Sequence, residues 1–133
     1  MRATILEKLQ AISEAGFTVS TVLPYDQGDT PLYLQNIKTI YVDLPQTEQD
    51  PLVSTLDGNG VYNEVITVNA IVGTDAKTLP SNYDSLISSM KAVALDDTVN
   101  GFNRKPVAVS TAYEGDIVIT TVSYSFVKTQ LDT

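Results

Sequence analysis

The chain has 133 residues, of which sixteen are Asp or Glu and eight are Lys or Arg, so its formal net charge is −8. It contains no cysteine and no histidine, which excludes disulfides, thiolate metal sites and the side chain that most often acts as a general base near neutral pH. From residue 39 to residue 76 no side chain is positive, whereas tight nucleic-acid binding relies on Lys and Arg that neutralise phosphates. This length predicts one domain over residues 1–133.

The opening segment predicts an amphipathic helix over residues 2–15, ended by Gly16. The apolar residues that recur at helical spacing are Ile5, Leu6, Leu9 and Ile12. Charged residues interrupt this segment, so it cannot be the apolar core of a signal peptide. No stretch of the chain reaches the length of a membrane span. We therefore expect a soluble cytoplasmic protein that has no contact with a membrane.

The next part of the chain favours strands over residues 17–23 and 37–44, with a loop over 24–31. The second strand places Ile40, Val42 and Leu44 on one face, and Thr39, Tyr41 and Asp43 on the other. This alternation is typical of a sheet that is covered on one side. Residues 45–60 are mostly polar, and we expect a long acidic loop there. Residues 61–72 are expected to form the longest strand of the chain.

The C-terminal third predicts a helix, a loop and a hairpin. Either Thr78 or Ser81 can cap a helix that runs to about residue 95. Its apolar stripe is formed by Tyr83, Leu86, Ile87, Met90 and Ala94. Residues 96–105 are expected to be a loop. The segment Glu114-Gly115-Asp116 then links strands over residues 106–113 and 117–127, because a central glycine between two alternating runs indicates a hairpin.

These elements predict an α+β fold in which two helices pack on one face of a mainly antiparallel sheet of about five strands. The other face of the sheet is expected to carry small neutral polar side chains. They are Thr67, Asn69, Thr121, Ser123 and Ser125. Such a face can meet water, or it can line or join an assembly.

The segment Leu56-Asp57-Gly58-Asn59-Gly60 looks like the centre of a helix-loop-helix calcium loop. When Gly60 takes the place of the loop glycine, the first ligand position falls on Thr55 and the twelfth falls on Ile66. Neither side chain is the charged anchor that those positions require. The pattern therefore favours a turn, and we expect no metal site.

Catalytic patterns are sparse. The paired carboxylates Asp96/Asp97 and Glu114/Asp116 lie in a loop at a helix end and beside a turn glycine, where acidic residues are common. No glycine-rich phosphate loop is present. We expect no enzyme activity, no catalytic residues and no cofactor. Four tyrosines in or beside the acidic segment suit either a small local core or an interface: Tyr25, Tyr33, Tyr41 and Tyr62.

The order of elements resembles that of the tail terminator proteins of long-tailed bacteriophages. The similarity covers most of the chain, including the helix stripe that begins at Tyr83 and the final alternating strand from Ile117 to Phe126. It is a similarity of layout, length and composition. The resemblance implies a virion protein, assembled in the host cytoplasm, that forms a hexameric ring.

The resemblance also implies partners. The ring would cap the completed tail tube, stop its polymerisation and provide the joining surface to the head. The expected partners are further copies of the chain, the tail tube protein and a head-completion or neck protein. DNA would pass through the lumen without specific binding, which is compatible with the acidic composition, because phosphate contacts would hold the duplex in place.

The subunit and tube interface is expected on and beside the acidic segment. Its candidate residues are Tyr41, Asp43, Gln46, Glu48, Asp50, Leu52, Leu56, Asp57, Asn59 and Tyr62. One alternative is a neck, head-completion or tail-tube protein of the same virion. A second alternative is a monomeric ion- or ligand-binding module that uses the acidic loop. A hydrolase would require acidic side chains that converge in one pocket.

Overall fold

The computed structural model describes residues 2–12, 16–25, 30–54, 60–93, 98–99 and 101–132. These residues form one mostly antiparallel sheet and three helices, which confirms the mixed α+β class. The helices are α1 (Arg2–Gln10), α2 (Leu32–Gln35) and α3 (Tyr83–Lys91). The strands are β1 (Thr18–Val19), β2 (Thr39–Val42), β3 (Gln46–Ser54), β4 (Gly60–Asp75), β5 (Thr98–Val99), β6 (Phe102–Arg104), β7 (Ala108–Glu114) and β8 (Ile117–Asp132). The prediction of about five strands is wrong, because the described sheet has eight.

Two long strands form the centre of the sheet. β4 and β8 have sixteen residues each and pair antiparallel along their whole length, whereas most strands have about 3–10 residues. β2 and β3 pair with successive parts of β4, while β7 and β6 pair with successive parts of β8. The short β1 pairs with β2 in the parallel direction. A turn at Gly115, whose φ is 59°, joins β7 to β8 and confirms the predicted hairpin.

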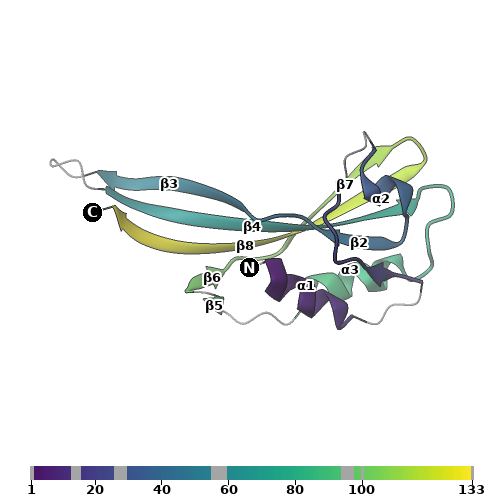
Figure 1. Cartoon of the computed structure of the whole chain (residues 1–133), viewed down its shortest axis with the longest axis horizontal. Coiled ribbons are helices and arrows are strands. Elements are labelled where there is room, and N and C mark those ends of the chain that lie inside the picture. Colours follow the sequence, from purple (N-terminus) through teal and green to yellow (C-terminus); the bar gives the residue numbers. More distant parts are fainter. Residues whose placement is uncertain are drawn as a thin grey trace.

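The main core lies between the sheet and the helices α1 and α3, which cover the same face (Figure 1). Both predicted helix stripes are buried against this face, in α1 through Ile5 and Leu9 and in α3 through Leu86 and Met90. They pack on alternate residues of the central strands: Val68, Ala70, Val72, Val122, Tyr124 and Phe126. The Arg2 guanidinium further ties α1 to the sheet, since its Nε donates to the Val42 carbonyl over 2.9 Å.

The short helix α2 packs against the opposite face, near one end of the sheet. Gly73 alternates with the core residue Val72 and therefore points away from α1 and α3. A Cβ built on Gly73 would lie 2.3 Å from the Tyr33 carbonyl oxygen of α2. Tyr41 is also buried on this side, and Asn36 Nδ2 donates to its hydroxyl over 3.0 Å. The two predicted helices, α1 and α3, share one face of the sheet, whereas α2 is an additional helix that covers the other face.

The loop predicted over residues 45–60 is largely a strand. Residues 46–54 form β3, which pairs antiparallel with β4. Its sequence lacks apolar alternation because, along the part whose side chains are described, from Gln46 to Gln49, both faces of the strand are exposed. Pro51 is compatible with this position, since proline is tolerated on edge strands and at bulges, and the register shifts between Pro51 and Val53. The LDGNG segment lies almost entirely in residues 55–59, outside the described residues.

Several boundaries also differ from the predictions. The helix α1 ends at Gln10, and α3 begins at Tyr83 with Asn82 at its N-cap, so neither Thr78 nor Ser81 caps it. The predicted strand over residues 37–44 is shorter, and Leu44 lies beyond it with 56% exposure. The loop predicted over residues 96–105 contains the paired strands β5 and β6. Those strands are too short to produce an alternating pattern in the sequence.

Candidate functional site

Part of the sheet projects beyond the helices as an arm (Figure 1). This arm consists of β3, residues 60–67 of β4 and residues 125–132 of β8. The side chains from Tyr62 to Thr67 are only half-buried, whereas Val68, under the helices, is completely buried. Among the described residues β3 pairs with β4 alone, so its outer backbone groups form an open edge. Among the described residues, the arm therefore combines an unpaired strand edge with exposed side chains.

The face of the sheet opposite α1 and α3 carries a ladder of small polar side chains. Three cross-strand pairs between β4 and β8 are hydrogen bonded: Asn63 with Thr129 at 2.9 Å, Thr67 with Ser125 at 3.0 Å, and Asn69 with Ser123 at 2.7 Å. This confirms the predicted neutral face. Because these groups satisfy one another, the ladder holds the arm in register without charge.

Two of the predicted interface residues lie together on the described edge of the arm. Gln46 and Glu48 are exposed on β3 and line a hollow of about 300 Å³ with Thr47, Val65 and Thr67. Asp43 lies just before this edge, half-buried, and its Oδ1 accepts a hydrogen bond from the Leu44 N–H over 2.7 Å.

The other predicted interface residues are distributed differently. Tyr62 is half-buried on β4, while Tyr41 is only 3% exposed and packs inside the subunit. Asp50 and Leu52 belong to β3 by their backbone, and their side chains are not described. Leu56, Asp57 and Asn59 lie outside the described residues, as does the calcium-like motif to which they belong.

A second hollow, which is basic, lies toward the edge of the sheet opposite β3. The sequence did not predict it. It encloses about 560 Å³ between the end of α3 and the segment after β6, where Lys91, Arg104 and Lys105 line it. All three side chains are exposed. The adjacent pair Arg104-Lys105 was the available signal, but three cations so close in space become visible only when α3 and β6 are placed together.

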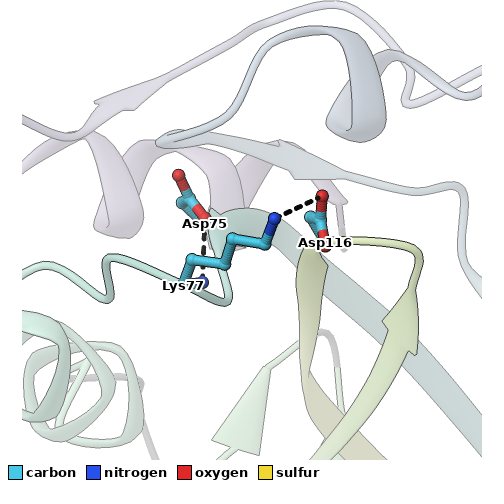
Figure 2. A network of polar contacts seen from close by, with 3 residues as sticks. All are labelled: Asp75, Lys77 and Asp116. Atoms are coloured by element: carbon cyan, nitrogen blue, oxygen red, sulfur yellow. Dashed lines mark hydrogen bonds and ion pairs between the residues drawn. The ribbon is translucent and has the colours of Figure 1, made fainter.

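Asp75 and Asp116 have a structural role at the end of the sheet that lies away from the arm. Lys77 Nζ lies 3.5 Å from Asp116 Oδ2, and the Lys77 backbone N–H donates to Asp75 Oδ1 over 2.9 Å (Figure 2). The Ala76 N–H also donates to the Asp116 carbonyl over 2.7 Å. These contacts tie the loop after β4 to the hairpin at Gly115. The ion pair is 75% and 71% exposed on its two sides, so it contributes at most about 1 kcal/mol.

Tyr33 and Tyr124 are poorly suited to proton transfer near neutral pH. Burial raises the pKa of Tyr33 to about 12, and its hydrogen bond with Tyr25 and the nearby Glu114 and Asp43 carboxylates act in the same direction. Burial also raises the pKa of Tyr124. Both phenols therefore remain protonated, and neither can serve as a general base there.

Among the residues that the structure describes, no group of three or more acidic side chains could hold a metal ion. No helix in these parts of the chain combines the length and the apolar character that crossing a bilayer requires.

No known protein-family model matches this sequence, and no curated protein sequence matches it. The function therefore has to be inferred from the arm, the polar ladder and the distribution of charge.

Proposed function

We propose that the chain is a bacteriophage tail protein that works as a tail terminator, forming a hexameric ring that caps the finished tail tube and joins it to the head. The observation that carries this proposal is the arm, whose open β3 edge extends beyond the helix-covered core. Long open edges promote unwanted pairing, and natural proteins usually shorten or cover them. An edge of nine residues fits a protein whose edge is covered by a neighbour after assembly.

The composition of the central strands supports a ring through which DNA passes. The polar ladder consists of neutral side chains, so it would provide no phosphate anchor to a moving duplex. A surface of this kind suits passage of DNA and does not suit its capture.

Native mass spectrometry and negative-stain electron microscopy of the purified full chain test this function. A terminator is expected to give closed rings of six subunits that do not stack further. A chain that polymerises into long tubes would be a tube subunit, and a chain that remains monomeric at all concentrations would overturn ring assembly. Either result would contradict the proposed function.

A further inference from the structure

Half of the positive charges of this acidic chain lie in one region of the structure. Four of the eight Lys and Arg residues lie at or beside β6: Lys91, Arg104, Lys105 and Lys128. The Lys128 Nζ lies 5.8 Å from the centre of the Phe102 ring, and three of the four line the basic hollow. The sheet therefore has a basic side at β6, while its β3 side carries Glu48 in a stretch of sequence without any cation.

The register places these two regions at opposite ends of the same rungs. Thr47 pairs with Ile66, Ile66 with Phe126, and Phe126 with Arg104. Glu48 starts the next rung, which runs through Val65 and Val127 to Asn103. Three strand spacings of about 4.8 Å separate the ends, so Glu48 and Arg104 lie about 14 Å apart within one subunit.

The two regions also lie on opposite faces. Arg104 shares a rung with the buried Phe126 and therefore points to the face covered by α1 and α3, as does the hollow beside Lys91. Glu48 shares a rung with Val65 and points to the other face, with the polar ladder. Patches on opposite edges and opposite faces allow identical subunits to overlap, so that each subunit contacts the next through two different surfaces.

We propose that the basic hollow binds the β3 edge of a second copy of this chain, with Glu48 of one subunit facing Arg104 and Lys91 of the next. This inference rests on the proposed ring and names the contact that builds it. The contact is heterologous, since one patch meets a different patch, and such contacts close into a ring when the rotation per subunit is right. Charge complementarity of this kind fixes the register of a contact and disfavours wrong partners.

A polyanion fits the hollow less well than a short acidic strand does. Nucleic-acid binding sites distribute many cations along the phosphate backbone. The three cations of the basic hollow are instead close together, and they belong to a chain of net charge −8. The β3 edge presents its acidic residue beside neutral Gln46 and Thr47, which matches a small basic hollow.

Charge reversal tests the contact in solution. We expect Glu48→Lys or Arg104→Glu alone to raise the apparent dissociation constant of the assembly by about tenfold or more, and the two changes in one chain to restore most of it. Glu7→Lys and Lys8→Glu on the exposed side of α1 are the matched controls and should assemble like the wild type. Single variants that assemble normally, or a double variant without recovery, would overturn the proposal.

Disulfide trapping detects the contact even when it is transient. It is specific here, because the native chain has no cysteine. Glu48→Cys and Arg104→Cys cannot pair within one chain, since a disulfide requires Cα atoms about 4.4–6.8 Å apart. A mixture of the two single-cysteine chains should give mainly mixed dimers under mild oxidation. A Glu7→Cys chain in place of Glu48→Cys should give far fewer.

The outcomes separate the contact from the function. Closed rings without the mixed disulfide would overturn this contact and leave the ring function standing. A strict monomer without the disulfide would overturn both. Loss of binding to a short DNA duplex by Arg104→Glu, with assembly unchanged, would assign the hollow to nucleic acid and overturn the proposal.

Discussion

The hydroxyl of Tyr124 donates a 2.6 Å hydrogen bond to the backbone carbonyl of Met90, which joins the central strand β8 to the last turn of α3. Tyr124 is 1% exposed. We expect Tyr124→Phe to reduce the free energy of unfolding by about 1 kcal/mol, because the buried carbonyl loses its phenol donor. Urea unfolding measures this change. Tyr113→Phe, at a side chain that is 73% exposed, is the control, and an equal effect of both substitutions would contradict the role of the bond.

Alkaline pH is expected to destabilise the fold through the same residue. Burial raises the pKa of Tyr124 above its usual value of 10, and it raises the pKa of Tyr33 to about 12. Below pH 10 the phenols are neutral in both the folded and the unfolded chain, so their full contribution is present. Above pH 10 the unfolded phenols ionise first, and the free energy of unfolding falls as pH rises.

Unfolding by urea at a series of pH values from neutral to strongly alkaline tests this decline. Tyr124→Phe should make the decline shallower, since one of the responsible groups is removed. An identical slope in the wild type and in Tyr124→Phe would show that Tyr124 does not contribute.

Gly73→Ala should destabilise the end of the sheet where α2 packs. The added Cβ would lie 2.3 Å from the Tyr33 carbonyl oxygen, so the backbone of α2 has to move. Overpacking of this kind typically costs about 1–3 kcal/mol, which the melting temperature and urea unfolding would report. Tyr33→Ala should not rescue Gly73→Ala, because the clash involves the backbone oxygen. A Gly73→Ala chain as stable as the wild type would contradict this packing.

The hydrogen-bonded side chains of the polar ladder should show a measurable coupling free energy when the protein unfolds. The Ser123 hydroxyl donates to Asn69 Oδ1 over 2.7 Å in a half-buried setting. A double-mutant cycle with Asn69→Ala and Ser123→Ala is expected to give a coupling of about 0.5–1.5 kcal/mol. Pairing Asn69→Ala with Thr129→Ala, whose hydrogen bond is to Asn63, provides a more distant control in the same ladder. Equal coupling in the two cycles would argue against a specific bond between Asn69 and Ser123.

The core could be predicted from the sequence because burial on one face imposes a period. Val68 and Ala70 alternate with Thr67 and Asn69, and the structure buries the first pair under the helices. Leu86 and Met90 likewise recur one helical turn apart and are both buried. Where one face of an element is buried, the choice of residue at every second or fourth position is constrained, and the pattern becomes visible.

The arm and the basic hollow could not be predicted in the same way. Both faces of β3 are exposed from Gln46 to Gln49, so no hydrophobic period marks the strand, and its polar residues predicted a loop. β5 and β6 have two and three residues, which is too short for alternation. Lys91 at the end of α3 and Arg104 in β6 line the same hollow although they are distant in sequence, so only the tertiary arrangement makes them neighbours.

The proline in β3 limits how far the open edge can propagate. Pro51 has no backbone N–H to donate, and the register of β3 shifts between Pro51 and Val53. An incoming strand can therefore follow β3 without interruption only from Gln46 to Asp50. Amyloid fibrils require uninterrupted, in-register stacking of identical segments, which proline opposes. In the proposed ring, the arm could accept one neighbouring subunit while Pro51 protects it from endless cross-β growth.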